Sequence, residues 1–246
     1  MLPRHDEIGL SRRIIEAVCI ATAVALWAVH LARFVLSGSS GSWPCFALAA
    51  AGMAMADFAS GLIHWIADTW GRESAPIIGR RLLHPFRVHH VNPDDLLNRS
   101  FLDANGDVAM VVLPFLAAMF WIPPAGAMGQ PTLAFMLGLT SVSLWTNQFH
   151  QWAHMSHPPR AVRWLQNCRL ILNRQVHERH HLAPHTTDYC ITTGWCNAPL
   201  KLVGFFPRAE SAITWATGLV PREDEASFHR AARAPRQTLE CEGSLP

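Results

Sequence analysis

Charged residues are scarce in this sequence, and lysine is almost absent. Asp, Glu, Lys and Arg make up 15% of the 246 residues, whereas soluble domains carry about 25%. Together with 50% hydrophobic residues, this argues against an ordinary soluble domain and indicates a membrane protein. Arginine provides 19 of the 20 basic residues, Lys201 being the exception, and this bias indicates a GC-rich, bacterial genome. The net charge of +2 gives no sign of a nucleic-acid partner.

Paired cysteines are also missing. The six cysteines contain no C-x-x-C motif, and the two nearest, Cys190 and Cys196, have five residues between them. This spacing argues against a disulfide framework and against a structural zinc site built on cysteine. We therefore expect these thiols to be reduced.

Long apolar stretches dominate what remains. Four of them are candidate membrane spans: residues 14–36, 43–66, 107–122 and 131–149. The first two are long enough for the roughly 30 Å hydrocarbon core, at about 1.5 Å per residue. The third is short, so it either begins earlier, near Phe101, or is tilted or incomplete. The sequence predicts an all-α, multi-span membrane protein with four transmembrane helices.

The charge distribution predicts the orientation. Residues 37–42 and 123–130, the connections on one side, contain no charged residue, and every basic residue except Arg33 falls on the other side. Basic loops remain cytoplasmic, so both termini should be cytoplasmic, in the inner membrane of a bacterium or the endoplasmic reticulum of a eukaryote. The expected division is a cytoplasmic N-terminus at 1–13, a membrane-embedded domain at 14–200 and a cytoplasmic tail at 201–246.

Histidines cluster on that same side. Of the 14 histidines, nine fall in four groups next to apolar segments: His64; His89 and His90; His150 and His154; and His177, His180, His181 and His185. In the last group, positions i, i+3 and i+4 share one helix face. Because neutral imidazole binds metals well, the pattern predicts a polynuclear metal site in a His-rich helical cap on the cytoplasmic side.

Two acidic residues accompany His64: Asp57 lies within the second apolar stretch and Asp68 lies just past its end. Asp57, His64 and Asp68 are spaced seven and four residues apart, so they share a helix face. An ionisable residue within a span indicates function. So many imidazoles can hold two ions of iron, copper or zinc. A metal pair beside membrane spans favours oxidation of an unactivated C–H bond of a lipid by O2.

At these motifs the chain resembles the plasmanylethanolamine desaturase family of lipid desaturases. The matching strings are ADFASGLIHWIADTWG (56–71), PFRVHHVNP (85–93), ANGD (104–107), TNQFHQWAH (146–154) and HERHHLAPH with YCITTGWCN (177–197). The resemblance implies an oxygen-dependent enzyme with two iron ions. It would form the vinyl ether bond of plasmalogens from the sn-1 O-alkyl chain of an ether phospholipid. Electrons would come from a small cytochrome b5-like or ferredoxin-like protein.

The resemblance also assigns residue roles. It implies eight metal ligands: His64, His89, His90, His150, His154, His177, His180 and His181. Asp68 would orient a ligand or bind metal itself, and His185 would be either a ligand or a supporting residue. Asn147 precedes His150 by three residues and shares its helix face, which predicts that it holds a metal-bound water. Arg87 and Arg174 are candidates for the lipid phosphate, although ordinary loop arginines explain them equally well.

A few positions depart from the family or play no part in its site. Arg99 stands where some members have His, which removes a ligand there. His84 replaces an Arg frequent in the family, and we do not count it as a ligand. His30, at the far end of the first apolar stretch, is expected to be structural.

Three alternatives remain open at this point. A sister branch of plastid desaturases acts on an acyl chain of phosphatidylglycerol, and a few residues decide between the branches. A lipid hydroxylase could use the same metal site, because desaturation and hydroxylation diverge after the first hydrogen abstraction. A membrane metal sensor or carrier without enzymatic activity is the third.

Overall fold

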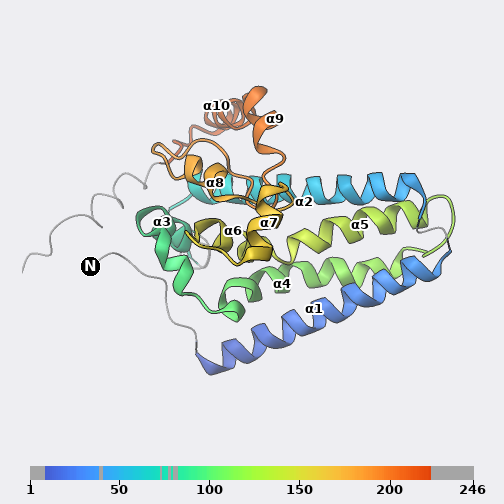
Figure 1. Cartoon of the computed structure of the whole chain (residues 1–246). Coiled ribbons are helices and arrows are strands. Elements are labelled where there is room, and N and C mark those ends of the chain that lie inside the picture. The colour runs from blue at the N-terminus through green and yellow to red at the C-terminus, as the bar shows by residue number, and fades with distance from the viewer. Residues whose placement is uncertain (1–8, 39–40, 73, 77–78, 80–82, 223–246) are drawn as a thin grey trace, which may run out of the picture.

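The computed structural model describes residues 9–38, 41–72, 74–76, 79 and 83–222. Every regular element in this part of the chain is a helix (Figure 1), as predicted. Four long helices are α1 (Leu10–Leu36), α2 (Trp43–Thr69), α4 (Phe101–Ala118) and α5 (Gly129–Ser143). The shorter ones are α3 (His84–Val91), η2 (Pro93–Asn98), η3 (Met119–Trp121), α6 (Thr146–His154), α7 (Arg160–Asn167), α8 (Arg174–His180), α9 (Asn197–Leu202) and α10 (Phe205–Thr217).

The four long helices lie side by side, and the shorter ones other than η3, which extends the far end of α4, gather at one end of them (Figure 1). Three segments of the described chain are long and apolar enough to cross a membrane: α1, α2 and residues Phe101–Trp121, which join α4 to η3. The third span therefore begins at Phe101. Ser100 caps it, its side chain accepting a hydrogen bond from the Asp103 amide at 3.3 Å.

The fourth apolar stretch forms two helices instead of one. Helix α5 ends at Ser143, a turn follows at Leu144 and Trp145, and α6 begins at Thr146. At 15 residues, α5 is about 22 Å long. The break lets α6 leave the bundle and carry His150 and His154 into the cap.

Small residues allow α2 and α5 to approach closely. A Cβ atom at Gly52 would lie 2.0 Å from the Phe135 carbonyl oxygen, and one at Gly138 would lie 2.0 Å from that of Ala49. Close helix contacts within membranes depend on such residues. The contact fixes the direction of α2, which carries His64.

His30 and Arg33 join α1 to the end of the third span. Nε2–H of buried His30 donates to the Leu116 carbonyl at 2.8 Å, and Arg33 donates to the carbonyls of Met119 (3.1 Å) and Ile122 (2.9 Å). These bonds satisfy carbonyls left open where α4 ends. The structural role expected for His30 is confirmed.

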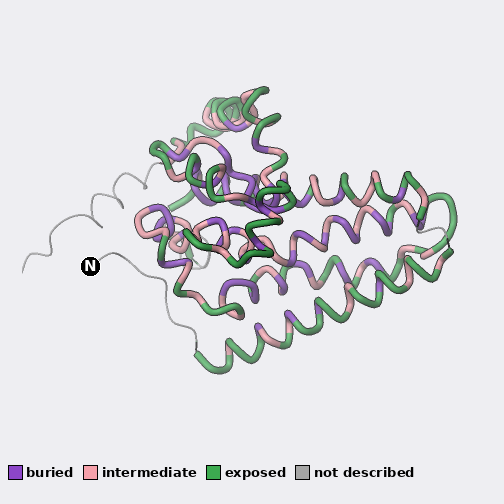
Figure 2. The backbone as a smooth tube through the Cα atoms, viewed as in Figure 1, coloured by how far each residue is buried: buried purple, intermediate pink, exposed green. Residues whose placement is uncertain are grey.

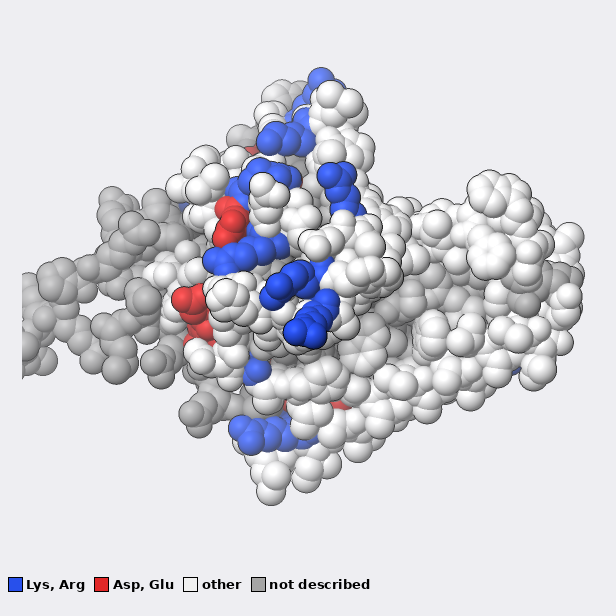
Figure 3. All heavy atoms as spheres, viewed as in Figure 1, with Lys and Arg blue, Asp and Glu red and all other residues white. Residues whose placement is uncertain are grey.

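Burial and charge distinguish the two ends of the molecule. Buried residues concentrate in the cap, whereas the outward faces of the long helices are exposed (Figure 2). In the most apolar window of α1 only 17% of the residues are buried. Lys and Arg gather over the cap and the start of α1 on the visible face (Figure 3). An apolar, uncharged outer surface of this kind is suited to contact with lipid.

The chain beyond Leu200, expected as a tail, is folded as far as residue 222. Phe206 of α10 packs with Trp65 and Tyr189. Trp65 donates to Glu210 at 3.0 Å, and Glu210 also pairs with Arg222 at 2.6 Å. Helix α10 thereby supports the end of α2 from outside. Residues 223–246 of the expected tail lie outside the described residues.

Candidate metal centre

In the described part of the chain, two groups of side chains that could hold a metal ion lie next to each other in the cap. The first contains five imidazoles from α3, α6 and α8 and from the residue after α8: His89, His150, His154, His177 and His181. The second contains three imidazoles and a carboxylate from α2, α3 and α8: His64, Asp68, His90 and His180. The eight histidines predicted as ligands are therefore brought together, and each belongs to one of the two groups.

The nitrogen spacing in the five-histidine group fits a single ion. Nε2 of His177 lies 2.8 Å from that of His150, 2.8 Å from that of His154 and 3.0 Å from that of His181. Nε2 of His154 lies 3.2 Å from that of His89. Ligands about 2.1 Å from one ion have neighbouring nitrogens roughly 3.0 Å apart. Five lone pairs converging in this way repel one another unless a cation lies between them.

The carboxylate group has similar dimensions. Oδ2 of Asp68 lies 3.2 Å from Nε2 of His64, 3.5 Å from that of His90 and 3.4 Å from that of His180. His90 and His180 approach to 3.1 Å. His64, Asp68 and His180 have at most 1% of their surface exposed, and Nε2 of His64 forms no hydrogen bond. A buried polar atom of this kind fits a metal ligand.

Backbone carbonyls set the direction of the rings in the second group. Nδ1–H of His64 donates to the Tyr189 carbonyl at 3.1 Å, and that of His180 donates to Thr187 at 2.9 Å. A hydrogen bond at Nδ1 leaves Nε2 as the ligand atom and fixes its orientation. Residues 187–189 thus hold the imidazoles of His64 and His180 in position through their backbone carbonyls.

Burial keeps these imidazoles neutral. Removal from water and, to a smaller extent, the nearby Arg174 guanidinium lower the pKa of His154 to about 4. Burial and the neighbouring His181 lower the pKa of His180 to about 3. Neutral imidazole is the form that binds metal. The ligands are therefore ready to bind at neutral pH without losing a proton.

Asp57 holds the segment that supports His64. Its Oδ1 accepts hydrogen bonds from the amides of Thr193 and Gly194, both at 2.9 Å, and from the Thr192 hydroxyl at 2.6 Å. Its Oδ2 accepts from the Cys196 amide at 2.9 Å. The carboxylate is fully buried, and these donors offset its loss of hydration. Asp57 shares a helix face with His64, as predicted, but it joins neither metal-ligating group.

Asn147 and His185 adjoin the centre without belonging to either group. The Asn147 amide donates to the Ala104 carbonyl at 2.8 Å, linking α6 to α4. The His185 ring stacks on His90 with centroids 4.4 Å apart, and its Nδ1 contacts the His180 carbonyl at 3.1 Å. His185 thus packs behind a ligand, one of the two positions predicted for it. His84 also lies outside both groups.

The two predicted phosphate-binding arginines have different positions. Arg87 is fully buried, and its Nη1 donates to the carbonyls of Ala67 and Asp68 at 2.8 and 3.1 Å. These contacts place the cation at the end of α2, beside Asp68. Binding of the lipid phosphate by Arg87 stays a prediction. Arg174 is partly exposed at the start of α8, where it pairs with Glu178 at 2.6 Å.

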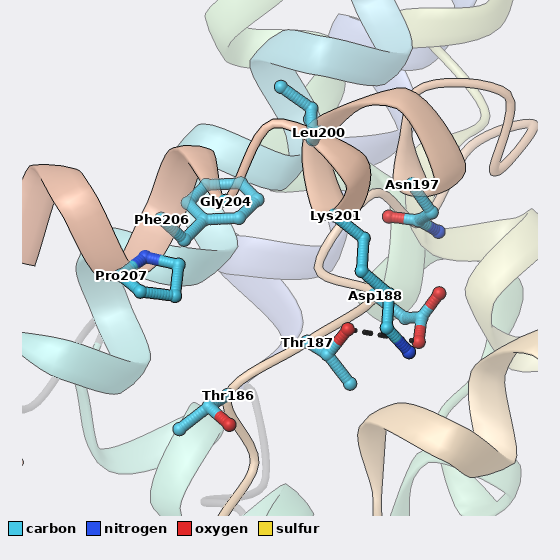
Figure 4. A pocket seen from close by; sticks show the side chains of 9 residues that line it. All are labelled: Thr186, Thr187, Asp188, Asn197, Leu200, Lys201, Gly204, Phe206 and Pro207. Carbon is cyan, nitrogen blue, oxygen red and sulfur yellow. Dashed lines mark hydrogen bonds between the residues drawn. The ribbon is translucent and has the colours of Figure 1, made fainter.

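Two cavities lined by described residues of the cap bear on the site. The larger, about 180 Å³, is lined by residues 186–188, α9 and the start of α10 (Figure 4). None of its lining residues belongs to a metal-ligating group. The smaller, about 80 Å³, is lined partly by His89, His150 and Asn147. It is therefore the one that opens onto the five-histidine group.

Comparison with known proteins agrees with the geometry. Residues 53–224 match the lipid desaturase domain. A plasmanylethanolamine desaturase of Myxococcus xanthus is 39% identical over 90% of this chain and 79% of its own length. Plasmanylethanolamine desaturase 1 of Mus musculus is 42% identical over 72% of this chain and 68% of its own length. The chloroplastic fatty acid desaturase 4 of Arabidopsis thaliana is 33% identical over 79% of this chain and 60% of its own length.

No solved structure matches the chain. The family match covers the part of α2 that carries His64 and every later helix that belongs to a metal-ligating group. The relatives align over most of this chain. The chain therefore belongs to the lipid desaturase domain family.

Proposed function

We propose that the protein is an O2-dependent desaturase that converts the sn-1 O-alkyl chain of a plasmanyl ether phospholipid into the vinyl ether of a plasmalogen. One observation carries the proposal: two adjacent nitrogen-rich groups lie at one end of apolar helices. The names of the bacterial and mouse relatives support this substrate class. A site at the ends of the helices lies near the glycerol backbone rather than in the middle of the bilayer.

Iron is the metal that we propose for both groups. Two iron ions held by the five histidines and by the Asp68 group would supply the O2-dependent oxidation. The first two carbons of the alkyl chain lose two hydrogen atoms, and O2 with two electrons and two protons leaves as two waters. The electrons come from a cytochrome b5-like or ferredoxin-like protein.

The chain's own residues hold and orient these ligands. Asp68 is proposed as a ligand of the second ion, since its Oδ2 lies 3.2–3.5 Å from three imidazoles. Asn147 lines the cavity beside His150 and is proposed to hold a water there. His185 keeps His90 in position by stacking. Arg174 remains a proposed contact of the lipid head group.

The orientation is part of the proposal. Helix α5 is proposed to act as the fourth span, because it packs between α2 and the α1–α4 pair, and the cap is proposed to face the cytoplasm. Reporter fusions near Gly126 should then read as periplasmic or lumenal, and fusions near Asn92 as cytoplasmic. A cytoplasmic reading near Gly126 would contradict the four-span arrangement.

The function is tested with a pair of lipids that differ in one group. Enzyme supplied with iron, O2 and an electron donor should convert 1-O-alkyl-2-acyl phosphoethanolamine lipid into an acid-labile 1-alkenyl product. The diacyl lipid should be unchanged, because an ether oxygen stabilises charge or radical character on the adjacent carbon. Mass spectrometry before and after acid treatment distinguishes the products.

Two other products would reject the assignment. A double bond within an acyl chain would favour the activity named for the Arabidopsis relative. A stable hydroxylated lipid as the only product would favour a hydroxylase.

A further inference from the structure

The smaller cavity opens directly onto the five-histidine group. It lies between α3, η2 and α6, and its lining residues are Pro85, Phe86, His89, Asp95, Leu96, Arg99, Asn147, His150 and Ile191. Its volume of about 80 Å³ is far below the roughly 300 Å³ of the smallest ordinary ligand pockets. The cavity therefore fits part of a ligand beside the centre, such as a head-group fragment, and not a whole lipid.

Among the described residues that line the cavity, Arg99 is the only lysine or arginine. Its Nε is buried and forms no hydrogen bond within the described part of the chain. A buried N–H group of a cation without an acceptor is unfavourable. An anionic oxygen entering the cavity would supply that acceptor.

The position of Arg99 in the chain sets its depth. It lies two residues before Phe101, where the third candidate span begins. A residue at the start of a span lies at the level of the lipid head groups. The cation that lines the cavity is therefore at the depth where phospholipids carry their phosphate.

We propose that this cavity receives the phosphate of a zwitterionic glycerophospholipid, with Arg99 as its ligand. The proposal rests on the proposed function, because it assumes that the lipid to be oxidised lies against the same cavity. Guanidinium binds phosphate oxygens with two parallel N–H groups. Asp95, buried in the same wall, adds negative charge that suits a head group with an ammonium and disfavours an anionic one.

The test compares a phospholipid with its phosphate-free counterpart. Arg99→Gln in the full chain should raise the KM for 1-O-alkyl-2-acyl phosphoethanolamine lipid by about 10- to 100-fold with little change in kcat, the size expected for one charged hydrogen bond. The KM for 1-O-alkyl-2-acylglycerol should not change. The KM of Arg99→Lys for the phospholipid should fall between those of the unmodified protein and Arg99→Gln, because lysine keeps the charge and loses the planar pair of donors. Arg163→Gln, an exposed arginine of α7, is the matched control.

Metal content and lipid binding separate this proposal from its premise. Iron per chain should be the same in Arg99→Gln and in the unmodified protein. Native mass spectrometry of Arg99→Gln and of the unmodified protein, each with the phospholipid, measures binding without turnover. Weaker lipid binding by Arg99→Gln, in a protein that forms no vinyl ether, would reject the proposed activity and retain the phosphate site.

Other results would overturn the phosphate site. They are an unchanged KM for the phospholipid in Arg99→Gln, an equal rise in KM for both lipids, or a loss of iron. Competition by millimolar inorganic phosphate with no preference for the phospholipid would reassign the cavity to free phosphate. An equal effect of Arg163→Gln would show that general surface charge, and not this cavity, attracts the lipid.

Discussion

Replacing His177 with alanine is expected to abolish turnover and remove metal from the five-histidine group. Its Nε2 lies within 3.0 Å of the corresponding nitrogens of His150, His154 and His181, so it occupies the middle of the set. Loss of a residue that only supports a ligand costs about 10- to 100-fold in metal affinity or activity. Loss of the central ligand should lower metal affinity and activity by more than about 100-fold.

Metal analysis and activity should be measured on the same membrane preparation. Iron per chain is expected to fall by about half in His177→Ala, since the second group keeps its own four donors. The protein should still insert, because His177 lies in α8 and outside the candidate spans. His157→Ala is the matched control, since this exposed histidine is three residues beyond His154 and should keep both iron and activity.

Full iron content with full activity in His177→Ala would contradict the five-histidine site. Loss of both ions would mean that the two groups bind metal as one cooperative unit. That result is distinguishable from unfolding by the yield of inserted protein.

Much of the centre could be predicted because its chemistry is carried by side chains at regular spacing. His177, His180 and His181 show the i, i+3, i+4 pattern of one helix face. His64 and Asp68 show it again in an apolar stretch, where an ionisable group stands out. The hydropathy pattern predicted four spans, and three of them are helices long and apolar enough to cross a membrane. For the third, the start near Phe101 was one of the options that the pattern left open.

The pairing of the ligands could not be predicted. His89 and His90 are adjacent in sequence, yet they point into different groups, because successive residues of a helix diverge by about 100°. His180 and His181 are divided in the same way. Which ring joins which ion depends on how α3, α6 and α8 pack, and no local pattern records that.

The backbone groups that form hydrogen bonds with the site residues also could not be predicted from the sequence. The carbonyls that orient His64 and His180 come from Tyr189 and Thr187, and every residue carries a carbonyl. The role of Asp57 requires a turn of four amides brought back to α2. The only sequence signal for it was an acid in an apolar stretch followed, far along the chain, by the string TTGWC.

Asp68 is the residue that makes the two metal-ligating groups unlike. The first group offers five neutral nitrogens, whereas the second offers three nitrogens and a carboxylate. A carboxylate neutralises part of the charge of a bound cation, and a hard oxygen ligand favours iron over softer metals. Without it, three imidazoles would hold the second ion in a pocket where His64 and His180 have no exposed surface.

Asp68→Asn is therefore expected to remove the second ion and, with it, the turnover. The amide has nearly the same size, so the packing against His64 and His180 is kept while the negative charge is lost. Iron per chain should fall by about half and activity by more than about 100-fold, with Asp94→Asn, an exposed acid of η2, as the unaffected control. Mössbauer spectra of the unmodified protein should show two different iron environments, and the variant should keep only one of them. Retention of both ions with a modest loss of activity would instead show that the Asp68 carboxylate is not a required ligand of the second ion, because an asparagine oxygen binds a cation far less strongly than a carboxylate.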